Sequence, residues 1–132
     1  MGKTNMFTLL TVVVVQFVLG YLWYTHLFSD VVTVGGHSID FLKLDIVSIL
    51  LVIFGSYGLT YILGMLHKLT GTKDVGTGIK LGLTVGTFAI GLPIVMMLNL
   101  MGFTKIVLLV VFTHVVIMTI LTNIVVIKLK KA

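Results

Sequence analysis

Four long stretches without charge constrain this chain more than any other feature of its sequence. Residues 6–28, 46–66, 81–101 and 106–127 contain no Lys, Arg, Asp or Glu, and each stretch is 21 to 23 residues long. Because an α-helix rises about 1.5 Å per residue, about 20 apolar residues cross the roughly 30 Å hydrocarbon core of a bilayer. The pattern therefore predicts four membrane-spanning segments.

Helices are the expected form of all four segments, although Val and Ile are abundant in them. A β-strand averages only about 5–6 residues, and the stretches lack the polar alternation of a barrel wall. A helix also pairs every backbone polar group within its own segment, as lipid requires. We expect one domain over residues 1–132, an all-α integral membrane four-helix bundle with helices at about 6–28, 46–66, 79–101 and 106–127.

The composition excludes an ordinary soluble globule. Hydrophobic types make up 58% of the 132 residues and charged types 10%, whereas soluble domains carry about 25% charged residues. The charges are nine Lys and four Asp, with no Arg and no Glu. The chain has no Cys, which excludes disulfide frameworks, thiol catalysis and cysteine-based zinc sites.

The lysines predict the orientation in the cell membrane. Four crossings place the N-terminus, the middle loop and the C-terminus on one side, with seven lysines, and leave two on the other. Cytoplasmic loops carry the excess of lysine, so both termini are expected in the cytoplasm and the loop at 29–45 outside. The net charge of +5 fits attraction to anionic lipid. With no soluble domain to present a basic patch, nucleic acid is not an expected partner.

Small residues in the third segment indicate close helix packing. Gly78, Gly82 and Gly86 recur every four residues on one helix face, and such spacing lets helix backbones approach closely in lipid. The face serves either packing within one four-helix bundle or a seam between copies of the chain. Pro93 lies further along the same segment and is expected to kink the helix near Ala89, four residues earlier.

Few polar side chains lie inside the predicted segments. Gln16, His114, Thr119 and Asn123 are the candidates for a polar path, with Thr119 and Asn123 one turn apart on one face. Polar groups at such positions either bond neighbouring helices together or carry a function. His114 is the one imidazole deep within a predicted segment, away from its ends, and is placed to relay protons or bind a ligand. His67 is expected instead to mark the headgroup region, next to Lys68.

Imidazole and carboxylate groups also occur in the predicted external region. His26, Asp30, His37 and Asp40 combine ligand types that suit zinc, nickel or copper. Loops are ordinarily polar and none of these spacings is diagnostic, so no metal and no other cofactor is expected.

The end of the first segment carries the most specific motif. Gly20-x-Leu22-Trp23-Tyr24 resembles the signature of the family called domain of unknown function 1761, small prokaryotic membrane proteins of about this length. The resemblance implies a four-helix membrane protein and no particular activity. At the start of the fourth segment, where that family often has Trp, residues 104–106 are Thr-Lys-Ile. Trp23 and Tyr24 are also expected in an aromatic belt at the outer interface, with Gly20 and Tyr24 forming a notch for a neighbouring helix or ligand.

Two classes of function follow from these features. The first is a non-enzymatic structural, accessory or interaction protein that contacts lipid and either its own copies or another membrane protein. The second is a small oligomeric transporter or channel subunit, with the path through Gln16, His114 and Asn123. Transport driven by a carboxylate inside the membrane is excluded, because no Asp or Glu lies within a predicted segment. No P-loop and no His-Glu-x-x-His zinc motif occurs.

Overall fold

The computed structural model describes residues 6–23, 33–34, 37–38 and 46–130. The elements are α1 (Met6–Tyr21), the short strands β1 (Thr33–Val34) and β2 (His37–Ser38), α2 (Ile46–Thr70), α3 (Val75–Thr84), the π-helix η3 (Val85–Gly91), α4 (Leu92–Leu100) and α5 (Lys105–Lys130). The two strands pair antiparallel. Helix dominates the described chain, as predicted.

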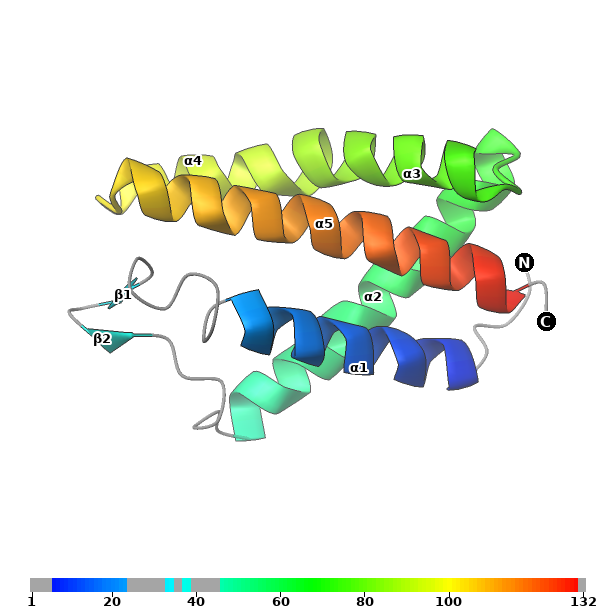
Figure 1. Ribbon diagram of the computed structural model, residues 1–132, viewed down its shortest axis with the longest axis horizontal. Coiled ribbons are helices and arrows are strands. Elements are labelled where there is room, and N and C mark those ends of the chain that lie inside the picture. Colours follow the sequence, from blue (N-terminus) through cyan, green and yellow to red (C-terminus); the bar gives the residue numbers. More distant parts are fainter. Residues whose placement is uncertain (1–5, 24–32, 35–36, 39–45, 131–132) are drawn as a thin grey trace.

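Helix α5 lies at the centre of the bundle. It packs against α1, α2, α3, η3 and α4, and Figure 1 shows α3, η3 and α4 following one another as a single rod beside it. Helix α1 lies on the other side of α5, and α2 crosses behind both. The start of α1 and the end of α5 lie at the same end of the bundle (Figure 1), as an even number of antiparallel segments requires.

Three helical segments are long and apolar enough to cross a membrane. They are Ile49–Thr70, Val75–Leu100 and Lys105–Leu129, whereas α1, also apolar, has 16 residues. The first predicted segment, 6–28, continues past α1 as a π-turn at Leu22 and Trp23. Residues 24–28 lie outside the described part. The structure therefore supports three of the four predicted spanning helices by length and composition.

The predicted helix ends were wrong around the middle loop. Helix α2 extends to Thr70, past the predicted 66, and α3 begins at Val75, before the predicted 79. Gly71 follows α2 with a φ of +69°, a left-handed conformation that favours glycine and ends helices. Asp74 caps α3 by accepting a hydrogen bond from the Thr77 amide at 3.0 Å. Charge marks where an apolar stretch ends, whereas the caps decide where the helix ends.

The Asp74 cap leads to a pH-dependent prediction. The Thr77 backbone N–H, and then the Thr77 hydroxyl, hold the pKa of Asp74 below its ordinary value of 3.8. A carboxyl whose pKa is lower in the folded state stabilises the fold above its unfolded pKa, and this contribution is lost as the pH falls through the folded pKa. We expect hydrogen-exchange protection of the Thr77 amide to be constant above about pH 5 and to fall below pH 3.8.

Asp74→Asn is the matched control, because asparagine caps helices about as well as aspartate and does not titrate. Its Thr77 protection should not change with acid. An equal acid response in the variant and the parent protein would contradict the role of the Asp74 carboxylate.

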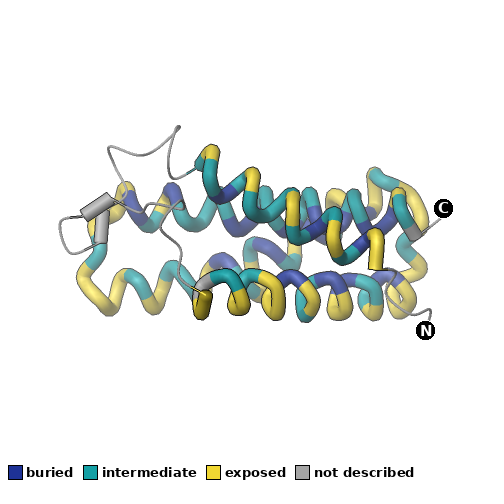
Figure 2. Tube along the Cα trace, turned by 90° about the horizontal axis from the view of Figure 1, so that it is seen from below, coloured by how far each residue is buried: buried dark blue, intermediate teal, exposed yellow. Residues whose placement is uncertain are grey.

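The interior of the bundle is unusually polar and its surface unusually apolar. Among the fully buried side chains, Leu63 and Val12 are joined by four polar ones, Asn123, Thr119, Thr122 and Ser56. Large apolar side chains lie outside, with Phe54 69%, Phe88 68% and Leu100 80% exposed. Figure 2 shows the buried positions on the sides of the helices that face one another. This distribution suits a lipid environment, where polar side chains in the interior bond the helices together and apolar side chains on the outside contact the lipid.

The glycines of α3 and the first glycine of η3 pack directly against α5 within one chain. A Cβ added at Gly82 would lie 2.9 Å from the Ile120 Cα, and one at Gly86 would lie 3.1 Å from the Val116 Cα. A Cβ at Gly78 would collide with the Ile127 side chain. The glycine face was expected either to pack within one bundle or to form a seam between copies of the chain. In the structure it packs within one bundle.

The π-helix η3 adds a fourth glycine, Gly91, to the face formed by Gly78, Gly82 and Gly86. After Gly86 the next buried glycine is Gly91, five residues later instead of four, which matches the i→i+5 hydrogen bonds of a π-helix. A Cβ at Gly91 would lie 2.9 Å from the Phe112 ring. In an unbroken α-helix Ile90 would take this place and collide with α5. The π-turn therefore keeps glycine against α5 and turns Ile90 aside.

A π-helix lies where the sequence predicts a kink, since Ala89 falls within η3. The helix passes through this region as a π-turn, and Figure 1 shows no sharp break between α3 and α4. Pro93 is the second residue of α4, directly after the π-helix. The wider π-turn over Val85–Gly91 accommodates the proline.

Candidate functional site

The first buried polar cluster joins three helices near the end where α2 finishes. His67 Nε2 donates to Asn123 Oδ1, and Asn123 Nδ2 donates to the Gly78 carbonyl at 2.9 Å. His67 is only 4% exposed and Asn123 is fully buried. The Asn123 amide therefore ties α5 to both α2 and α3. The His67 ring lies inside the bundle, and its place at headgroup depth stays a prediction.

The second cluster connects α1 to α2. Ser56 Oγ donates to Gln16 Oε1 at 2.7 Å, and Thr60 Oγ1 donates to the Ser56 carbonyl at 2.7 Å. Ser56 and Thr60 are buried. The Gln16 amide nitrogen is buried too, and it has no hydrogen-bond partner among the described residues. One half of this amide is thus bonded and the other half is not.

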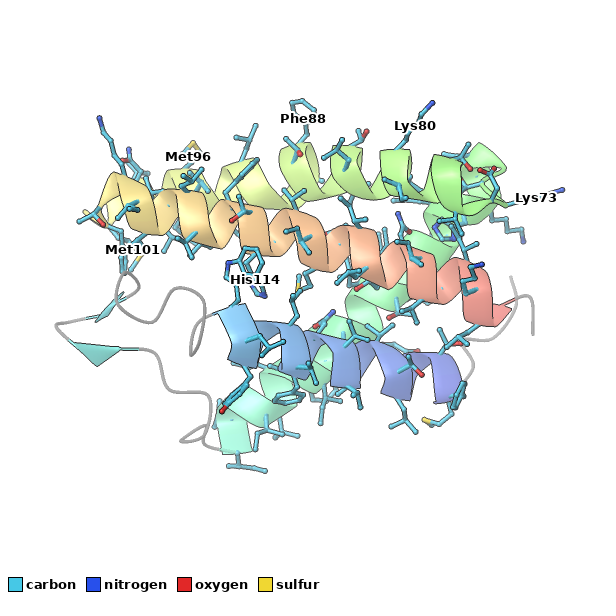
Figure 3. The ribbon with its side chains drawn as sticks, viewed as in Figure 1. Lys73, Lys80, Phe88, Met96, Met101 and His114 are labelled. Atoms are coloured by element: carbon cyan, nitrogen blue, oxygen red, sulfur yellow. The ribbon has the colours of Figure 1, made fainter. Side chains whose placement is uncertain are left out.

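The third cluster docks the end of α1 on α5. Trp23 Nε1 donates to the Val110 carbonyl at 3.1 Å, and the Trp23 and His114 rings lie 6.0 Å apart. Figure 3 shows His114 extending from α5 toward the end of α1. The indole of Trp23 therefore faces a neighbouring helix, and its place in an aromatic belt stays a prediction. Gly20 is buried and Leu22 is 44% exposed, while Tyr24 lies outside the described residues.

The structure does not bring the predicted polar path together. His114 and Asn123 are nine residues apart on α5, and at 3.6 residues per turn this places them on opposite sides of the helix. Thr119 lies one turn before Asn123 on the same side of α5. Its hydroxyl, however, donates to the Val115 carbonyl of its own helix at 2.9 Å. Gln16, His114 and Asn123 consequently belong to three separate clusters.

An apolar cavity of about 370 Å³ lies beside Gln16. Helix α2 supplies most of its wall, through Leu51, Val52, Gly55 and Leu59, and Ile90 of η3 and Met118 of α5 complete it. Leu51 is 66% exposed, so the cavity reaches the surface of the bundle at α2. Its volume falls in the range of about 300–1,000 Å³ typical of small-molecule sites.

The external metal candidates are largely outside the described residues. His26, Asp30 and Asp40 fall there, and of His37 only the backbone in β2 is described. Within the described ranges no three His, Asp or Glu side chains gather closely enough to hold a metal ion.

Comparison with known proteins returns no match. No family model matches the chain, and no curated protein or solved structure is similar to it. Membership in the family of domain of unknown function 1761 stays a prediction that rests on the motif at residues 20–24.

Sequence reasoning missed three parts of this site. The pairing of His67 with Asn123 was not predicted, because Lys68 suggests a membrane boundary beside His67 and Asn123 is 56 residues away. Gly91 was not assigned to the glycine face because a period of four residues was assumed. The cavity had no sequence signal except its small wall residue, Gly55.

Proposed function

We propose that the chain is a non-enzymatic, four-pass membrane protein with both termini in the cytoplasm, acting as an accessory or interaction protein. One observation supports this role most directly. The described polar side chains inside the bundle form separate clusters that join neighbouring helices, and a conducting path needs polar groups that follow one another across the membrane. The motif that resembles domain of unknown function 1761 fits the same interpretation.

The role is tested by flux through proteoliposomes that contain the purified protein. We expect proton, sodium, potassium and chloride fluxes equal to those of protein-free vesicles, with an ionophore added at the end to prove that the vesicles hold a gradient. A flux that His114→Leu or Asn123→Leu abolishes in folded protein would overturn the accessory role and favour an oligomeric transporter.

The orientation is tested by cysteine labelling, because the natural chain has no Cys. Lys73→Cys lies in the turn between α2 and α3, and Thr104→Cys lies in the turn between α4 and α5; both positions are exposed. A membrane-impermeant maleimide added to intact cells should label Thr104→Cys and should reach Lys73→Cys only after permeabilisation. The reverse pattern would overturn the proposed orientation.

A further inference from the structure

Positive charge without a counter-ion gathers near the end of the bundle where α2 ends and α3 begins. Four exposed lysines lie there, Lys68, Lys73, Lys80 and Lys128, and Figure 1 shows that α5 finishes at the same end. None of their ammonium groups has an ion-pair or hydrogen-bond partner within the described part of the chain. Asp74, the one carboxylate among the described residues, accepts from the Thr77 amide and hydroxyl instead. The described chain therefore leaves these four cations for an outside partner to neutralise.

Lys80 is on the face of α3 that turns away from the rest of the bundle. It lies midway between Gly78 and Gly82, which pack against α5, and two residues correspond to a rotation of about 200° around a helix. Figure 3 shows the Lys80 side chain extending away from α5, and the exposed Phe88 extends on the same side further along the rod. A molecule on this face would contact a cation first and an apolar surface next.

The position of Lys80 along the rod matches the level of lipid headgroups in the proposed four-pass arrangement. Residues 81–100 follow it without a charge, and at 1.5 Å per residue they cover about 30 Å, the thickness of the hydrocarbon core. The Lys80 ammonium then stays among the headgroups, because a charge in hydrocarbon is costly. Lys73 comes seven residues earlier, just before the Asp74 cap, so it lies on the aqueous side of the same layer.

We propose that the outward face of α3 binds an anionic phospholipid, with Lys80 and Lys73 holding its phosphate and Phe88 contacting an acyl chain. The inference rests on the membrane location given under the proposed function. A zwitterionic headgroup cancels the phosphate charge with its own ammonium, so a headgroup without that ammonium, as in phosphatidylglycerol, complements unpaired lysines better. A soluble phosphate compound has no apolar part and would leave Phe88 uncovered. The order of charge and apolar surface along this face therefore favours the lipid.

The test counts the lipids that bind to the purified, delipidated protein, as read by native mass spectrometry. We expect dioleoyl phosphatidylglycerol to bind at about tenfold lower concentration than dioleoyl phosphatidylcholine. Lys80→Gln should weaken binding of phosphatidylglycerol about fivefold, and adding Lys73→Gln should remove the preference between the two lipids. Equal binding of both lipids by the parent protein would overturn the proposal.

Lys128→Gln is the matched control, because it removes the same charge near the same end, but from α5. It should weaken phosphatidylglycerol binding less than about twofold, since attraction between exposed charges falls off within a Debye length. Lys80→Arg keeps the charge and a good phosphate donor, so it should bind like the parent protein. The changed residues are all exposed, and circular dichroism verifies the fold of each variant. Equal weakening by Lys80→Gln and Lys128→Gln would overturn a site on α3.

Glycerophosphoglycerol, the same headgroup without acyl chains, tests whether the partner is a lipid. In excess it should leave the bound phosphatidylglycerol in place, whereas displacement of the lipid would assign the lysines to a soluble phosphate compound and overturn the proposal. Lipid counting in detergent needs neither a sealed vesicle nor a fixed orientation. Its failure would therefore leave the flux and orientation results of the proposed function untouched.

Discussion

Replacing Gly82 by isoleucine is expected to prevent the bundle from folding. The first atom of any side chain at Gly82 would lie 2.9 Å from the Cα of Ile120, and a backbone atom cannot rotate away as a side chain can. Even Gly82→Ala should lower the free energy of unfolding by about 1–3 kcal/mol, the usual cost of overpacking. The larger isoleucine should leave little folded protein. The measurement is unfolding of the purified protein in a fixed detergent or lipid mixture.

Gly58→Ala provides the control for the Gly82 variants. A Cβ at Gly58 meets no atom within 4 Å, and alanine in a helix interior is favoured over glycine by about 1 kcal/mol. This variant should be as stable as the parent protein or more stable. If Gly82→Ile instead left a stable monomer and removed only a crosslinked dimer, the glycine face would serve association between copies.

Replacing Asn123 by leucine is the second change with a large expected effect. Leucine has a similar size but can neither accept from His67 Nε2 nor donate to the Gly78 carbonyl. Removing one partner from a buried hydrogen bond costs about 1–3 kcal/mol, and here α2 and α3 both lose their connection to α5. We expect the free energy of unfolding to fall by an amount in that range, measured as for Gly82.

Two further variants test the cause of this loss. Asn99→Leu makes the same chemical change at an exposed position of α4, and it should alter stability by less than about 0.5 kcal/mol. Combining Asn123→Leu with His67→Leu should cost less than the sum of the single changes, because contacting residues couple by about 0.5–3 kcal/mol. Strict additivity would contradict a stabilising bond between the two side chains.

The sequence predicted the helical class and the approximate segments because charge is so costly in hydrocarbon. Stretches without charge therefore locate apolar helices even in a single sequence. The helix ends were predicted less well, since Gly71 and Asp74 end and begin helices through their own conformations and bonds. Both residues are visible in the sequence, but the helix ends were predicted from the positions of the charged residues.

The parts of the site that were missed depend on contacts between distant residues. The spacing of Gly78, Gly82 and Gly86 predicts a close approach without naming the partner, and only the fold shows that α5 takes that place. His114 and Asn123 are two of the few polar residues in the fourth predicted segment. Their nine-residue spacing nevertheless places them on opposite sides of α5. That spacing was available in the sequence and would have divided the predicted path.

The π-turn allows chains that differ in length by one residue in the third segment to form the same bundle. The extra residue between Gly86 and Gly91 is confined to one turn, so α4 presents the same face to α5 as it would without it. A chain lacking one residue here would carry glycines at a strict period of four and build the same bundle with an ordinary α-helix. We therefore expect a one-residue deletion between residues 86 and 91 to change the helix type and to keep the packing of α3 and α4 against α5.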